Sequence, residues 1–162
     1  QQWTLSKALV VIDKLREMNP YWVEEPTDPD DILAHQTLAR AFHPIRIALG
    51  EHVSNKVLFK NFLQANAMEI NQVDALRVGG ISEFILISLM SRKCGVPVIP
   101  HVGDMGQIHQ HMVLFNHISM SHPKMFLECI PHLRKYFKDP ATIEDGVYLV
   151  PQTPGSSSDF NN

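Results

Sequence analysis

Apolar side chains in the first hundred residues follow two alternating patterns. In one, they recur every three or four positions, as between Leu5 and Met18, which predicts a helix with one buried face. In the other, they form short runs such as Ile45 to Leu49 that end at a glycine, proline or charged residue, which predicts buried strands. The predicted helices cover residues 5–18, 28–42, 57–67 and 82–92, and the strands that follow them cover residues 21–23, 45–49, 70–73 and 96–99.

The last third of the chain carries a weaker version of this alternation. A segment with three histidines, His109, His111 and His117, leads to a short apolar stretch at 118–120 that is a candidate strand. Residues 127–137 have helical spacing, and residues 142–151 predict a hairpin that turns at Asp145-Gly146. From Thr153 onward the chain is rich in Gly, Ser and Asn, so residues 153–162 are expected to form a loose tail.

Strands that alternate with helices of this length form βαβ units on a parallel sheet. The strand–helix repeat is roughly 25 residues, which matches a (β/α)₈ barrel of about 250 residues. A chain of 162 residues holds only part of such a barrel. We therefore predict an α/β fold in which residues 1–152 form one piece of a TIM-type (β/α) barrel.

Polar residues fall at the ends of the predicted strands. Glu24, Glu51, Asp74 and His101 each come just after a strand. One such residue means little, because strand-to-helix loops are polar and helix starts favour acids. Four in succession indicate a site, because the carboxyl ends of the strands of a (β/α) barrel meet on one face.

Glu24 and Glu51 suit a hard divalent cation. Mg²⁺ takes oxygen ligands in octahedral geometry and keeps several waters, and carboxylates from neighbouring strands can supply the oxygens. Side chains that are adjacent on a strand point to opposite faces, so Glu25 is expected to support the ligands and not to bind the metal. No cysteine–histidine cluster has the spacing of a structural zinc site.

Asp74 and His101 are expected to form an acid–base pair. A carboxylate beside an imidazole fixes its tautomer and favours its protonated form, which gives a proton donor or acceptor near neutral pH. The other histidines carry less weight. His109 and His111 are two positions apart and would face different ways on a helix, so solvated or locally bonded rings are expected there.

The composition of the chain limits the kinds of partner and the cellular location that we expect. Lys and Arg number 14 against 17 Asp and Glu, for a formal net charge of −3, which argues against a nucleic-acid partner. The longest apolar run, residues 84–90, is too short to cross a membrane. Two cysteines, Cys94 and Cys129, give no disulfide framework. An intracellular location, in the cytoplasm or the mitochondrion, is therefore expected.

Longer stretches surround the four strand-end residues. They are Trp22-Val-Glu-Glu-Pro-Thr-Asp-Pro-Asp-Asp31, Gly50-Glu51, Gln72-Val-Asp-Ala-Leu-Arg-Val-Gly-Gly80, Val96-Pro-Val-Ile-Pro-His101, Leu127-Glu128 and Asp145-Gly-Val-Tyr148. Through these stretches, which span almost the whole chain, it resembles the sugar-acid dehydratases of the enolase superfamily. The nearest resemblance is to the L-fuconate and L-galactonate dehydratases.

The resemblance implies a role for each matching position. Glu24 and Glu51 would be two of the three Mg²⁺ ligands. His101, oriented by Asp74, would protonate the departing 3-hydroxyl group. Glu128 would hydrogen-bond the carboxylate of the sugar-acid substrate as the enediolate forms. The implied reaction removes the α-proton and the β-hydroxyl group and gives a 2-keto-3-deoxy sugar acid, a step in the catabolism of carbohydrate acids.

The resemblance also implies parts that lie outside these residues. The first metal ligand is an aspartate expected just before Gln1, and the Lys-x-Lys base, the first barrel strands and an N-terminal capping domain are expected earlier still. Asp104 stands where relatives have glycine. Two alternatives therefore stay open: another racemase or dehydratase of the superfamily, or a catalytically inactive fragment. An open part-barrel would also favour pairing of two copies into a homo-oligomer.

Overall fold

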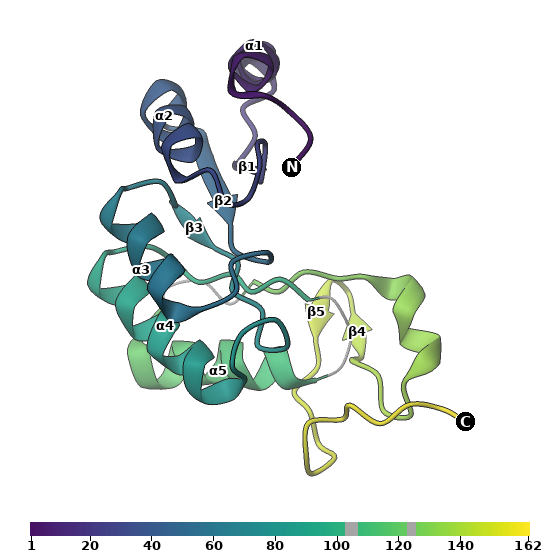
Figure 1. Ribbon diagram of the computed structural model, residues 1–162. Helices are drawn as coiled ribbons and strands as arrows, with labels where there is room; N and C mark the ends of the chain where they lie inside the picture. The colour runs from purple at the N-terminus through teal and green to yellow at the C-terminus, as the bar shows by residue number, and fades with distance from the viewer. Residues whose placement is uncertain (103–106, 123–125) are drawn as a thin grey trace.

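The protein is described by a computed structural model that covers residues 1–102, 107–122 and 126–162. Its centre is a parallel sheet in the order β1 (Trp22–Glu24), β2 (Arg46–Leu49), β3 (Ile70–Asn71). Val23 lies opposite Ile47, and Ala48 lies opposite Ile70. The three strands confirm the prediction, and the mixed α/β architecture is that of a partial barrel (Figure 1).

The fourth predicted strand is much shorter than residues 96–99. Only Val98 makes a bridge, parallel to Asn71. The Asn71 amide donates to the Pro97 carbonyl, and the Ile99 amide donates to the Asn71 carbonyl, both at 2.9 Å. Pro97 has no amide hydrogen to donate, so the ladder to β3 cannot continue before this point.

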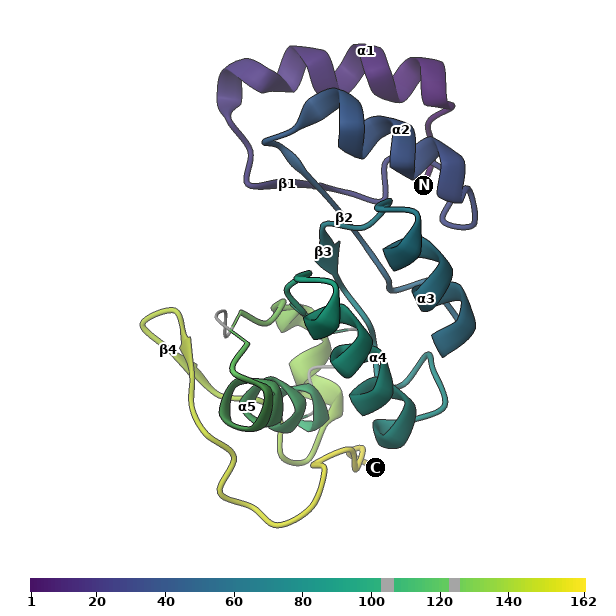
Figure 2. The ribbon, with the colours of Figure 1, turned by 90° about the vertical axis from the view of Figure 1, so that its left-hand side faces the viewer.

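Helices follow the strands in the predicted order. Their bounds are α1 (Leu5–Leu15), the 3₁₀ turn η1 (Arg16–Met18), α2 (Ile32–Phe42), α3 (Lys56–Gln64), α4 (Ile81–Lys93) and α5 (Ile108–Met120). Figures 1 and 2 show the helices arrayed along one side of the sheet, with α1 beside α2 and α3 beside α4.

Three of the helices begin at a side chain that caps them. The Thr4 hydroxyl accepts from the Lys7 amide, Asp31 accepts from the Ala34 amide, and Asn55 accepts from two amides of α3. Each cap satisfies amide hydrogens that have no partner within the helix. The sequence therefore fixes where α1, α2 and α3 start.

The two faces of the sheet bury different side chains. Ile47 and Leu49 belong to the main core, together with residues of the covering helices such as Phe59 and Phe84. Ala48, which lies between them on β2, packs with Ile70 of β3, Ile99 and Trp22 in a smaller cluster on the opposite face. This period of two is that of a barrel strand, whose inward and outward side chains alternate.

Gly50 lets the chain turn sharply after β2. Its φ is +146°, and a Cβ atom there would lie 2.8 Å from the backbone carbon of Gln72. Only glycine accepts this combination of backbone angle and close approach. The next residue is Glu51, so Gly50 sets the position of a predicted site residue.

The structure corrects two predictions in the last third of the chain. Residues 118–120 form the end of α5 and not a strand, and Ile118 is exposed while Met112, Asn116 and Met120 are buried at helical spacing. Residues 127–137 contain only the 3₁₀ turn η2 (Pro131–Tyr136). Pro131 disfavours helical geometry at the residue before it, and Ile130 is accordingly not helical.

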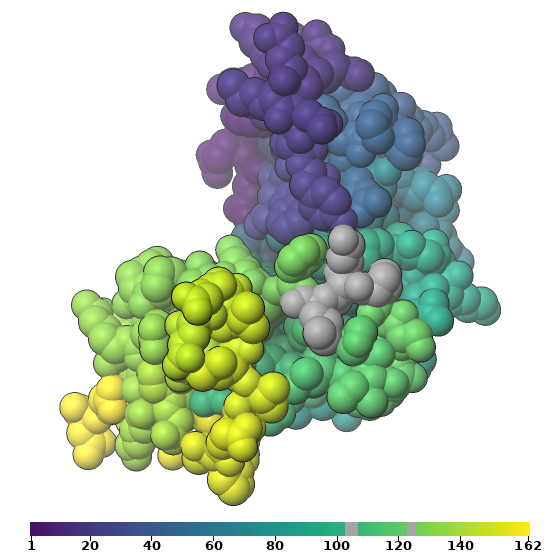
Figure 3. Space-filling view, turned by 180° about the vertical axis from the view of Figure 1, so that it is seen from behind, coloured from purple at the N-terminus to yellow at the C-terminus, as the bar shows by residue number. Residues whose placement is uncertain are grey.

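The predicted hairpin is present as β4 (Ile143–Glu144) and β5 (Val147–Tyr148), which pair antiparallel. Residues 153–158, in the expected tail, form no helix or strand, and near the chain end Phe160 pairs with Phe137. The Asn161 amide donates to the Tyr136 carbonyl at 2.8 Å, which attaches the end of the chain to η2. Figure 3 shows this C-terminal part, in yellow-green and yellow, against the teal and green middle of the chain and below its purple N-terminal part. No helix among the described residues is long and apolar enough to span a membrane.

Candidate active site

Three of the four strand-end residues meet at the carboxyl edge of the sheet. The Nδ1 atom of His101 lies 2.8 Å from Oδ2 of Asp74, and its Nε2 atom lies 2.6 Å from Oε2 of Glu51. The His101 side chain is 7% exposed and that of Asp74 is 2% exposed. Both ring nitrogens of a buried imidazole are thus held by carboxylates from neighbouring strand ends.

This arrangement shifts the pKa values of the pair in opposite directions. Burial alone would lower the pKa of His101, but the hydrogen bond to Asp74 and the charges of Glu51 and Glu128 raise it above its ordinary value. Burial alone would raise the pKa of Asp74, but hydrogen bonds from His101 and His109 hold it well below its usual range. The pair therefore favours an imidazolium facing an ionised carboxylate, a proton donor near neutral pH.

Glu128 reaches the same imidazole from the segment after α5. Its Oε2 atom lies 3.6 Å from Nε2 of His101 and accepts a hydrogen bond from the Val102 amide at 3.1 Å. The Tyr148 hydroxyl donates to its backbone carbonyl, which ties this segment to β5. Glu128 lies in a segment without helix or strand, so the helix predicted there was wrong while its approach to the carboxyl edge agrees with expectation.

Glu24 lies on the inner face of the sheet. Its Oε2 atom accepts from Nε2 of Gln72 at 2.6 Å and from Nε1 of Trp22 at 3.3 Å. A pocket of about 510 Å³ opens beside it and is lined by polar, aromatic and aliphatic residues. These include Trp22, Glu24, Gln72, Ile99, Phe126 and Glu128. Two carboxylates therefore border a hollow next to the His101 cluster, of a size that suits a small organic molecule.

Glu25 and His52 support Glu51 from the side away from His101. Glu25 is 3% exposed, and its Oε2 atom lies 2.9 Å from Nδ1 of His52. The same His52 nitrogen is 2.9 Å from Oε1 of Glu51, and Nε2 of Gln1 donates to both glutamates at 2.8 Å. The motifs in the sequence did not single out His52, although it comes directly after Glu51.

A divalent cation fits the donors present here. Among the described residues, Glu25, Glu51 and His52 each offer a ligand atom, and these atoms lie within 4.8 Å of one another. Oxygen donors suit Mg²⁺, and Glu24 from the adjoining strand offers a further carboxylate. This tight group contains Glu51, one of the two glutamates predicted as ligands, and Glu25, which was expected only to support them. Glu24 lies outside the group, and its carboxylate accepts from Gln72 and Trp22.

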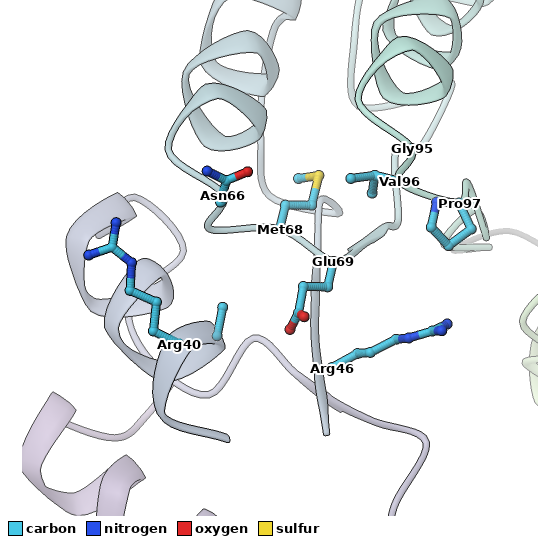
Figure 4. A pocket seen from close by; sticks show the side chains of 9 residues that line it. Arg40, Arg46, Asn66, Met68, Glu69, Gly95, Val96 and Pro97 are labelled. Carbon is cyan, nitrogen blue, oxygen red and sulfur yellow. The ribbon is translucent and has the colours of Figure 1, made fainter. Parts of the chain in front are cut away.

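A separate pocket lies at the opposite, amino end of the strands. Its volume is about 400 Å³, and Arg40, Arg46 and Glu69 lie around it (Figure 4). Nearby, Nδ1 of His43 is 3.7 Å from Oε1 of Glu69, with the histidine side chain 76% exposed. This end also carries a histidine–carboxylate contact, but a solvated one.

The whole chain, residues 1–162, matches the family described as Enolase C-terminal domain-like. The chain belongs to this family. It is 39% identical to human mitochondrial enolase superfamily member 1 over 99% of the chain, and 37% identical to L-galactonate dehydratase of Hypocrea jecorina over 97% of the chain. It covers 38% and 36% of the lengths of those two proteins. The resemblance stated from the sequence motifs is therefore confirmed.

Solved structures of this family share the fold of the chain. The crystal structure of the human relative superposes with a TM-score of 0.92, covering 99% of this chain and 38% of that one. L-talarate dehydratase from Polaromonas sp. JS666, complexed with Mg and L-glucarate, superposes with a TM-score of 0.80 at 29% identity, covering 99% and 43%. That dehydratase binds a metal and a sugar acid on the same scaffold.

Proposed function

We propose that the protein containing this chain is a Mg²⁺-dependent dehydratase of a sugar acid, of the L-galactonate or L-fuconate type. The observation that carries the proposal is the contact of His101 with Asp74 at 2.8 Å and with Glu51 at 2.6 Å, beside the pocket bordered by Glu24 and Glu128. Relatives named as sugar-acid dehydratases support the reaction class.

In this proposal, two of the carboxylates bind the metal and a third contacts the substrate. Glu51 and Glu24 hold Mg²⁺, which when bound stabilises the negative charge that develops on the substrate carboxylate. Glu25 and His52 keep Glu51 in place through the contacts at 2.9 Å. Glu128, next to the pocket, contacts the substrate carboxylate and hydrogen-bonds it by donating a proton that one of the two carboxyl groups must carry.

His101 delivers the proton that completes water loss. Asp74 accepts the Nδ1–H of the ring, and Nε2 faces Oε2 of Glu51 at 2.6 Å, with Oε2 of Glu128, a residue of the pocket wall, at 3.6 Å. After a base from an earlier strand removes the α-proton, the bond between the β-carbon and its hydroxyl breaks, and the Nε2 proton leaves with that hydroxyl as water. The resulting enol becomes a 2-keto-3-deoxy acid.

The proposal is tested on the complete protein with a panel of sugar acids. L-galactonate, L-fuconate, L-talarate, galactarate and L-rhamnonate are each incubated with Mg²⁺ and with a chelator, and keto-acid formation is measured. We expect a keto acid from at least one of them with Mg²⁺ and none with the chelator. No keto acid from any of the five, in protein that binds Mg²⁺, would contradict the proposal.

A further inference from the structure

A second imidazole contacts the carboxylate that orients His101. Nε2 of His109, near the start of α5, lies 3.0 Å from Oδ1 of Asp74. The other oxygen of Asp74 is the one bonded to His101. Asp74 is thus placed between two imidazoles, one on each carboxylate oxygen, and the Leu76 amide also donates to Oδ1 at 2.8 Å.

The contact fastens the turn after β3 to α5. Besides Asp74, the Ala75 amide nitrogen lies 3.0 Å from the same Nε2 atom of His109. When Nε2 of His109 carries a proton, it donates that proton to Asp74. When Nε2 carries no proton, its lone pair accepts from the Ala75 amide. The two contacts are therefore alternatives at one nitrogen. In either state the ring holds the two-residue segment Asp74–Ala75, which is 34 positions away in the chain.

An apolar side chain would fill this position at lower cost. His109 is fully buried, and its ring packs edge-on to Phe84 at 6.5 Å between ring centres. Met112 and Val113, on the same helix, are buried apolar residues. Burying an imidazole is costly unless a partner compensates it, and the ionised Asp74 is a strong one. The choice of histidine here is explained by Asp74.

We propose that His109 is a positioning residue that fixes Asp74, and through it the orientation and tautomer of His101. The effect of His109 on catalysis rests on the dehydratase function proposed above. The structural link from His109 to the His101 ring is independent of that function. His109 touches no substrate in this account and acts only through Asp74.

Two amides that differ by one methylene group test the proposal in the complete protein. The side-chain amide of His109→Gln reaches the position of the imidazole Nε2 and can donate or accept there, whereas that of His109→Asn falls short of Asp74. We expect His109→Asn to lower kcat about 10-fold with KM within about twofold, because slight misplacement of a reacting group slows the chemical step. His109→Gln should keep at least half of the wild-type kcat.

A spectroscopic readout separates this role from general loss of structure. In protein without substrate, the Nδ1–H proton of His101, assigned by its loss in His101→Asn, should be seen by NMR in the wild type and in His109→Gln. It should be weakened or lost in His109→Asn, while the circular dichroism spectra of all three agree. If His109→Asn does not fold, His109→Leu, of similar volume without a polar group, takes its place.

Two results would overturn the proposal. One is an unchanged His101 signal and kcat in His109→Asn. The other is a loss in His109→Gln as large as in His109→Asn, because a positioning contact at Nε2 should be rescued by the longer amide. A wild-type protein without turnover on sugar acids would instead contradict the dehydratase function, and the NMR comparison would still decide the link from His109 to His101.

Discussion

The two ends of the parallel strands each bring a histidine to a carboxylate, with very different surroundings. At the carboxyl end, His101 and Asp74 are 2.8 Å apart with side chains 7% and 2% exposed. At the amino end, His43 and Glu69 are 3.7 Å apart with side chains 76% and 24% exposed. Water screens the second pair, so it contributes little, whereas burial makes each proton of the first pair matter. A histidine and a carboxylate can thus serve as a proton donor pair only where burial and close geometry hold them together, as at His101 and Asp74.

The largest difference between the two ends is expected when one carboxylate is removed from each. Glu51→Gln takes a charge from the group of Glu25, Glu51 and His52 and from its 2.6 Å contact with His101. We expect at least a 100-fold loss of turnover and weaker Mg²⁺ binding by calorimetry, because the ion loses a charged oxygen ligand. The matched control is Glu69→Gln at the amino end, which should change turnover less than twofold.

Equal losses from both glutamine variants would contradict the difference between the two ends. A more local version of this test compares Glu24→Gln with Glu25→Gln. The proposed ligand is Glu24, so its variant should bind Mg²⁺ more weakly. The reverse order would assign the metal to the tight group formed by Glu25, Glu51 and His52.

Glycines at the two ends offer a test of stability. Gly50→Ala places a methyl group 2.8 Å from the Gln72 backbone at a φ of +146°. We expect the free energy of unfolding to fall by about 3 kcal/mol, from strain and overpacking together. Gly95, at the amino end, has a φ of +73° and nothing within 4 Å of an added Cβ. Gly95→Ala should therefore cost only about 1 kcal/mol, the penalty of the left-handed conformation.

Urea unfolding of both alanine variants measures this difference. The Gly50→Ala variant should also lose activity beyond its loss of stability, because the turn that places Glu51 would move. A Gly50→Ala protein as stable as Gly95→Ala would show that the backbone of Gln72 can yield to the methyl group.

The smallest expected effect is in the pH dependence of stability without added metal. The pKa of His101 is raised above its ordinary 6.5, so its contribution to stability is complete below about pH 6.5 and is lost as pH rises through the folded-state value. The pKa of Asp74 is depressed, so its contribution is present above about pH 3.8 and is lost as pH falls through the folded-state value.

Unfolding of the wild type and of His101→Asn at several pH values measures the histidine contribution. The difference in unfolding free energy between them should shrink from pH 6 to pH 9. His43→Asn should follow the wild-type curve, because its exposed contact is screened by water. A difference that grows with pH would contradict the sign given to His101.

The barrel strands and the strand-end residues could be predicted because they depend on local pattern. In a run such as residues 45–49, four of the five residues are apolar and a glycine follows, and the carboxyl ends of parallel strands must share an edge. Glu51, Asp74 and His101 therefore come together as the spacing implied. The stretch at 118–120 was assigned wrongly because three residues, two of them apolar, fit a strand and a helix equally well.

His109 could not be found in the same way. Its partner Asp74 is 35 positions earlier, and the contact depends on how α5 packs against the turn after β3. Spacing within α5 shows that position 109 is buried, but a buried histidine alone does not name its partner. Contacts between elements are set by tertiary packing, which a single sequence does not display.

The central claim is that His101, and not merely a histidine beside a carboxylate, supplies the proton that completes dehydration. It is tested most directly by the rate of keto-acid formation in His101→Asn and in the matched variant His43→Asn of the complete protein with Mg²⁺. Asn keeps a polar group but cannot transfer a proton at neutral pH, so His101→Asn should lose about 10²–10⁴-fold in kcat while His43→Asn keeps the wild-type rate. Full turnover by His101→Asn, with the sugar acid that the wild type converts, would contradict the account.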